Sequence, residues 1–100
     1  MNFVYEQALQ DYMQRKGKNA IIVEVATSNC SDFEVTELNV HFVTEKQAAY
    51  FRNRKRFRSY AAPLGEVLLP PYRLEYDDTI TFGIKSFLGI KQVTQQGIRL

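Results

Sequence analysis

Apolar side chains near the start of the chain recur at the spacing of one helix face. Four of them stand at positions i, i+4, i+7 and i+8, and they are Tyr5, Leu9, Tyr12 and Met13. This spacing places all four on one side of an α-helix. Asn2 is suited to cap its start, and Gly17 is suited to end it because glycine readily adopts the left-handed conformation. The pattern predicts a helix over residues 2–16.

Two later segments alternate with the period of a β-strand. Within residues 19–28, one face carries Ile21, Val23 and Val25, and the other carries Ile22, Glu24 and Ala26. Within residues 35–43, Leu38, Val40 and Phe42 alternate with Glu37, Asn39 and His41. The first segment predicts a central strand and the second a half-buried antiparallel strand. The small and polar residues between them predict a turn.

The second half of the chain divides into shorter segments. Residues 45–51 predict a helical turn or a loop, and residues 55–62 predict a strand in which basic and aromatic residues alternate. Further strands are expected at residues 72–76, 79–84 and 90–94, with a turn or sheet edge at Pro70 and Pro71 and a turn at Asp77 and Asp78.

These elements predict one domain that spans residues 1–100. A chain of 100 residues is long enough for one core, and it shows no internal repeat and no linker. One helix and about six or seven short strands indicate an α+β fold that is mainly β. We expect the N-terminal helix to pack on a twisted, mostly antiparallel sheet, or on a small sandwich or barrel.

Composition indicates the cellular compartment in which we expect the protein. The longest apolar runs are far shorter than the ~20 residues that span a bilayer. The first residues lack the basic and apolar regions of a signal peptide. The single cysteine, Cys30, cannot form an internal disulfide, which fits a reducing compartment. We therefore expect a cytoplasmic protein with no membrane partner.

Charge is distributed unevenly along the chain. Residues 1–50 carry four Lys or Arg against seven Asp or Glu, whereas residues 51–100 carry nine against four. Five of the nine lie in the segment "FRNRKRFR", and they are Arg52, Arg54, Lys55, Arg56 and Arg58. In a strand, Arg54, Arg56 and Arg58 would share one face. Such a face binds nucleic acid or phosphate, or it is a solvated edge strand whose charges prevent edge-to-edge pairing.

The only cysteine and the only histidine are the other candidates for chemistry. Cys30 stands in a polar, turn-like segment, as a working thiol would, but the nearby Asp32 and Glu34 oppose thiolate formation. His41 lies on the polar side of its predicted strand, which favours a surface role. A Cys–His pair is conceivable, while a metal site needs three or four ligands. No Walker A, GxGxxG, HExxH or CxxC motif is present, and we expect no catalytic site.

Three motifs in a fixed order resemble a known family. They are "QRKGKNAIIVEV" at residues 14–25, "TSNCS" at residues 27–31 and "SFLGIKQVTQQGI" at residues 86–98. Together they resemble the HesB-like superfamily, which includes the A-type iron–sulfur scaffold proteins, and within it the CC/Se motif branch. The resemblance implies a HesB-like fold and iron–sulfur or thiol-redox chemistry. Residues 44–75 match only in being strand-like with a proline.

The cysteines depart from that resemblance. The CC/Se branch carries a pair of cysteines, or cysteine with selenocysteine, where this chain has Asn29 and Cys30. The C-terminal cysteine pair of the classical scaffolds has no counterpart here. Only Cys30 is carried over as a candidate ligand of iron or a cluster, and a homodimer would supply two thiolates of the usual four.

Three hypotheses about function remain. The first is a non-catalytic HesB-like protein related to iron–sulfur or thiol-redox chemistry through Cys30. The second is a polyanion-binding module that uses the arginine-rich residues 52–58. The third is a structural or interaction domain.

Overall fold

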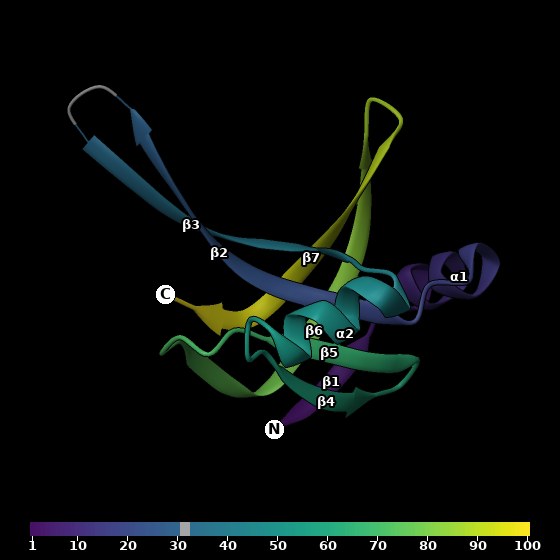
Figure 1. The fold of residues 1–100 in the computed structure, drawn as a ribbon. Coiled ribbons are helices and arrows are strands. Elements are labelled where there is room, and N and C mark those ends of the chain that lie inside the picture. The colour runs from purple at the N-terminus through teal and green to yellow at the C-terminus, as the bar shows by residue number, and fades with distance from the viewer. Residues whose placement is uncertain (31–32) are drawn as a thin grey trace.

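Strands dominate the computed structural model, which describes residues 1–30 and 33–100, with the side chains of residues 28–35 also outside the description. The described residues form seven strands and two helices. In chain order they are β1 (Asn2–Tyr5), α1 (Gln7–Lys16), β2 (Ala20–Cys30), β3 (Phe33–Phe42), α2 (Glu45–Asn53), β4 (Arg58–Ala62), β5 (Gly65–Leu69), β6 (Glu75–Phe87) and β7 (Ile90–Arg99). The predicted α+β class, mainly β, is confirmed (Figure 1).

The strands form two mixed sheets. One has the order β1–β6–β7 and the other the order β3–β2–β5–β4. The pairs β1–β6 and β2–β5 are parallel, and the remaining pairs are antiparallel. Most of the pairing is thus antiparallel, but the strands form two mixed sheets instead of one sheet, and the strands described do not close into a barrel. Each parallel pair joins strands that are far apart in sequence, so local patterns carried no sign of it.

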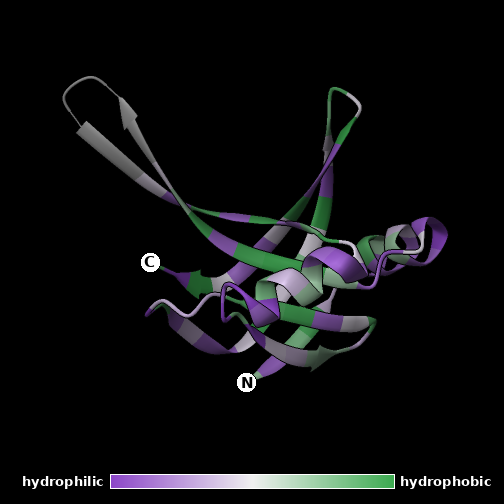
Figure 2. Ribbon diagram, in the orientation of Figure 1, coloured by the Kyte–Doolittle hydropathy of each residue, from purple (hydrophilic) through white to green (hydrophobic). Residues whose placement is uncertain are grey.

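The main core lies where α1 and the inner faces of the two sheets meet. Leu9 and Met13 of α1 are fully buried against Ile21 and Val23 of β2 and Phe82 of β6. The alternation predicted within residues 19–28 and 35–43 is confirmed, because Ile21, Val23, Val40 and Phe42 pack in this core, whereas Ile22 packs on the other face of the sheet. Figure 2 shows apolar residues along the middle of β2 and along β5. β2 and β5 therefore contribute side chains to the core on both faces of the four-stranded sheet.

A second, smaller cluster lies on the outer face of the four-stranded sheet. Ala48 of α2 is buried there against Ile22 of β2 and Leu68 of β5. Thr44 and Gln47 form a capping box at the start of α2, in which each side chain bonds to the other residue's backbone N–H. This cap favours a regular helix. The segment predicted as a helical turn or loop is thus a helix of nine residues.

The predicted N-terminal helix is correct only from Gln7 onward. Residues 2–5 form β1, which pairs in parallel with β6 and places Phe3 opposite Ile80. Aromatic and β-branched side chains suit a strand, and β6 satisfies the backbone groups of β1. The helix end is confirmed, since Gly17 is left-handed with φ of 67°.

The C-terminal half departs from prediction in its strand lengths. Asp77 and Asp78 do not form a turn but lie within β6, where the β6–β7 register shifts between Tyr76 and Thr81. The last strand extends from Ile90 to Arg99 instead of ending at residue 94. In Figure 1 the β6–β7 hairpin projects from the body of the molecule. Among the described residues, no helix has the length and apolar character needed to cross a bilayer.

Candidate anion-binding cleft

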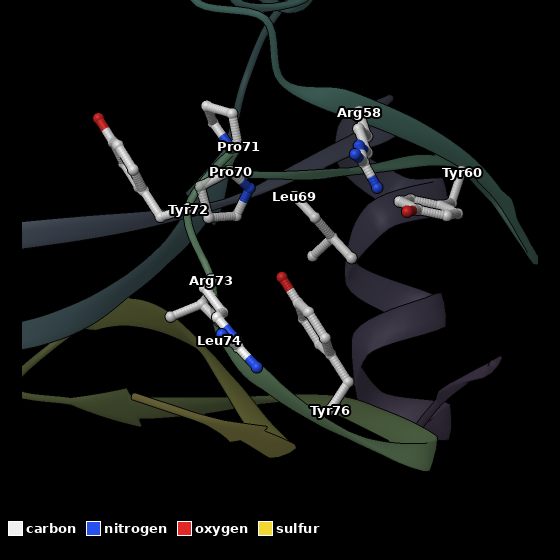
Figure 3. A pocket seen from close by; sticks show the side chains of 9 residues that line it. All are labelled: Arg58, Tyr60, Leu69, Pro70, Pro71, Tyr72, Arg73, Leu74 and Tyr76. Carbon is white, nitrogen blue, oxygen red and sulfur yellow. The ribbon is translucent and has the colours of Figure 1, made fainter.

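An open cleft of about 290 Å³ lies between β4, the β5–β6 connection and the start of β6. Nine side chains line it, among them two arginines and three tyrosines. In Figure 3 the Arg58 and Tyr60 side chains and the Tyr76 hydroxyl are directed toward the same space, while Tyr72 points away from it. Leu69 forms its buried floor. The cleft thus combines cationic, phenolic and apolar groups.

Strand alternation places Arg58 and Tyr60 in the cleft. They lie opposite Leu69 and Val67 of β5, whose side chains belong to the main core. Ser59, between them, points to the other face and donates a hydrogen bond to Glu66. The predicted alternation of residues 58–60 is therefore confirmed, and it aims one arginine and one tyrosine at the same side of the sheet.

Two prolines bring the rest of the cleft into place. Pro70 and Pro71 follow β5 directly, and their missing N–H groups end the ladder there, as the sequence predicted. The chain then continues through Arg73 to Tyr76 at the start of β6. The strand predicted at residues 72–76 begins only at Glu75. Arg73 and Tyr76 line the cleft, although the sequence had pointed to neither of them.

The cleft carries positive charge, and the described part of its wall contains no acidic residue. None of its nine lining residues is Asp or Glu. Glu75 and Asp77 flank Tyr76 in sequence, but both pair with Arg99 of β7, at 3.5 Å and 2.8 Å. The alternation of β6 turns these carboxylates away from the face that carries Tyr76. Their charge is therefore compensated outside the cleft.

The groups around the Tyr76 hydroxyl change its pKa. Burial raises its pKa above the usual value, the nearby Tyr60 raises it further, and the positive charge of Arg58 lowers it. Both neighbours thus influence the charge of Tyr76, and Figure 3 shows their side chains directed toward the same space as its hydroxyl. The phenol stays protonated at neutral pH and is available as a hydrogen-bond donor.

The structure divides the arginine-rich residues 52–58, which do not form one strand. The strand predicted over residues 55–62 begins only at Arg58. Arg52 lies in α2 and forms a salt bridge with Glu66 of β5. Arg54 caps the helix, and Arg56 has a left-handed φ of 59° in the turn that follows. Arg54, Lys55 and Arg56 are exposed, and they do not share one strand face with Arg58.

Two phenylalanines explain why the segment is divided. Phe51 and Phe57 pack edge to face, with ring centres 5.1 Å apart, and the Phe57 N–H donates to the Phe51 carbonyl. Both rings also pack on the smaller cluster beneath α2. Burial of this pair closes the chain into a turn between α2 and β4. Of the five basic residues first considered, only Arg58 lines the cleft.

The other sequence candidates, Cys30 and His41, lie far from each other along the β2–β3 pair. Cys30 ends β2, and its backbone pairs with Phe33, whereas the predicted turn would have left it unpaired. Its thiol lies outside the described residues. His41 lies opposite Ile22 of β2. Ile22 precedes Cys30 by eight residues in the same strand, which corresponds to about 26 Å at ~3.3 Å per residue. The fold therefore does not bring the Cys–His pair together within one chain.

His41 is a surface residue, as predicted. Its side chain is 46% exposed and contacts the Glu24 carboxylate of β2. Among the described residues, no group of three or more His, Cys, Asp or Glu side chains is placed to hold a metal ion.

The three comparisons with known proteins found no matching family model, no matching curated protein and no matching solved structure.

Proposed function

We propose that this protein is a binding module whose cleft holds one phosphate-bearing unit with a planar aromatic body, as in single-stranded nucleic acid. The observation that carries this proposal is the position of Arg58 beside Tyr60 and Tyr76 in a cleft whose lining, among the residues that the structure describes, contains no carboxylate. A guanidinium binds phosphate through two parallel hydrogen bonds. Tyrosine rings provide faces on which bases stack.

The size of the cleft limits the ligand. Its volume of about 290 Å³ is at the lower end of small-molecule sites, which occupy about 300–1,000 Å³. Because the cleft is open to solvent, the rest of a longer chain can extend out of it. Arg73 adds a second cation at its rim. We therefore expect one nucleotide to occupy the cleft while neighbouring nucleotides remain in solvent.

The test is fluorescence anisotropy of a labelled single-stranded oligonucleotide, measured from about 50 to 200 mM salt. Arg58→Ser should weaken binding about tenfold and reduce the salt slope by about one, since one phosphate contact is lost. Arg54→Ser is the matched control, because it removes the same charge from an exposed position outside the cleft. It should weaken binding less than about threefold.

Two results would contradict this function. One is an equal loss of affinity in the two variants, which would show that only net charge matters. The other is the absence of binding by the parent protein at the lowest salt. Thermal melting of both variants confirms that each is folded.

A HesB-like fold with an iron–sulfur or thiol-redox role for Cys30 is the second proposal. It is supported by the order of the three sequence motifs and by the position of Cys30 at the end of β2, in the last β2–β3 pair and at the opposite end of that ladder from the Ile21–Phe42 pair. Absorbance between about 320 and 450 nm after anaerobic purification would reveal a cluster with thiolate ligands. Loss of that absorbance in Cys30→Ser would assign the ligand, and its absence from the parent would leave an interaction domain as the remaining alternative.

A further inference from the structure

The tip of the β6–β7 hairpin exposes three large apolar side chains. Phe87, Leu88 and Ile90 are 70%, 85% and 70% exposed, respectively. Phe87 pairs with Ile90 across the hairpin, and Leu88 and Gly89 form the two-residue turn between them. In Figure 2 this tip is apolar and stands clear of the molecule. Exposed apolar groups gathered in this way mark an interaction site.

The backbone of the tip points to the same conclusion. Leu88 and Gly89 both have positive φ, 52° and 81°, as the two central residues of a type I′ turn do. Asn, Asp or Gly is favoured at the first of these positions, and leucine there is destabilising because of its Cβ. Folding alone would therefore select a small polar residue. The leucine at this position contributes apolar surface that the fold does not use.

Positive charge surrounds the base of the apolar tip. Lys85 of β6, Lys91 of β7 and Arg15 of α1 line one surface hollow below it, together with a single carboxylate, that of Asp11. All three cations are exposed, and none forms a salt bridge with a residue that the structure describes. An occupant of the tip must therefore accept apolar side chains and carry negative charge around them.

The shape of the β6–β7 tip and the positive charge around it together indicate which kind of partner the tip binds. The tip is convex, so a protein partner would need a matching groove, whereas a bilayer accepts a projecting group without one. A second copy of this chain would bring the two sets of lysines together, which is unfavourable. We propose that the β6–β7 tip inserts into an anionic lipid surface, with Phe87, Leu88 and Ile90 among the acyl chains and Lys85 and Lys91 at the headgroups.

This proposal differs from the expectation that the protein has no membrane partner. That expectation rested on the absence of a spanning segment, and insertion of a hairpin tip needs none. It is also independent of the proposed cleft function. Tyr76 and Phe87 lie near opposite ends of β6, eleven residues apart, or about 36 Å at ~3.3 Å per residue. Variants of the tip therefore leave the cleft unchanged.

Co-sedimentation with vesicles tests the proposal. The parent protein should bind vesicles of phosphatidylcholine with about 30% phosphatidylserine and not vesicles of phosphatidylcholine alone. Leu88→Asn should lower the partition coefficient about tenfold, because it removes an inserted side chain. Asparagine suits the turn, so the variant should melt at the same temperature or higher. Leu100→Asn is the matched control, since Leu100 is also exposed, at 57%, but lies outside the tip.

A tryptophan probe distinguishes insertion from surface contact. The chain contains no tryptophan, so Phe87→Trp gives a single fluorophore at the tip. Its emission should shift to the blue on anionic vesicles, while Tyr50→Trp on α2 should show no shift. Failure of the parent to bind, equal binding by Leu88→Asn, or binding without a shift would each overturn the proposal. Dimerisation lost in Leu88→Asn, without vesicle binding, would instead assign the tip to self-association.

Discussion

Tyr5 places a hydroxyl group inside the main core without a hydrogen-bond partner. The residue ends β1, is 3% exposed and packs edge to face against Phe82, with ring centres 5.9 Å apart. Among the described residues, no group lies within hydrogen-bond distance of its buried oxygen. A buried polar group without a partner costs about 1–3 kcal/mol. Replacement of Tyr5 by phenylalanine keeps the ring and removes this penalty.

We expect Tyr5→Phe to raise the free energy of unfolding by about 1 kcal/mol at pH 7. For a domain of this length, that corresponds to an increase of about 4–8 °C in the melting temperature. The sign is unusual, because most substitutions in a core destabilise. Tyr50→Phe is the matched control, since Tyr50 is 50% exposed on α2 and its change should have an effect below about 0.5 kcal/mol.

The pH dependence provides a second measurement on the same residue. Burial raises the pKa of Tyr5 from 10.0 to about 12. Below pH 10 the phenol is neutral in both the folded and the unfolded state, and its titration does not affect stability. Between pH 10 and 12 the unfolded chain ionises first, so stability is lost as pH rises. Two units of pKa correspond to about 2–3 kcal/mol.

Urea denaturation at pH 7 and at several values from pH 9 to 11 measures both effects. The difference in unfolding free energy between Tyr5→Phe and the parent should increase steadily above pH 10. Comparison with the parent cancels the titration of the other tyrosines and of the lysines. A loss of about 1 kcal/mol or more in Tyr5→Phe at pH 7 would refute the reasoning, since it would show that the hydroxyl makes a hydrogen bond in the folded protein.

Two further predictions concern backbone fit and the attachment of α2. Gly65→Ala should destabilise by about 2–4 kcal/mol, because φ is +117° and the new Cβ would lie 1.9 Å from the Asn19 carbonyl oxygen. Gly17→Ala, where no atom lies within 4 Å, should cost only about 1–2 kcal/mol in chemical denaturation, and equal costs would contradict the clash. A double-mutant cycle of Arg52→Ala and Glu66→Gln should give a coupling energy of about 1 kcal/mol that decreases in 1 M salt, and additive effects would show that this salt bridge does not hold α2 to the sheet.

Short-range patterns in the sequence predicted the parts of the fold that depend on near neighbours. The alternation of Ile21 and Val23 with Ile22 correctly assigned the two faces of β2. The helical spacing of Leu9 and Met13 and the glycine at position 17 correctly placed the body and the end of α1. These signals depend on a side chain and its neighbours within one or two turns, which is why they can be read without a structure.

Local sequence patterns did not predict most residues of the candidate cleft. Arg58 was identified within a run of five basic residues, but the other four are separated from it by a helix end and a turn that the Phe51–Phe57 contact closes. Arg73 and Tyr76 carry no signal of their own. They reach the cleft because β5 and β6 belong to different sheets and the chain between them crosses from one to the other. No local rule places these residues beside Arg58.

By itself, the sequence determined the α+β class, the face of β2 that is buried, and which segments are basic or apolar. Tertiary structure alone decided that residues 2–5 form a strand, because their backbone partners in β6 stand more than seventy residues later. It also decided that Asp77 and Asp78 belong to β6, because Tyr76 before them and Thr81 after them both pair with β7, and Asp77 forms an ion pair with Arg99. The physical reason is the same in both cases. Periodicity reports which face of a segment is buried, whereas strand pairing depends on backbone hydrogen bonds with a distant partner that local sequence does not specify.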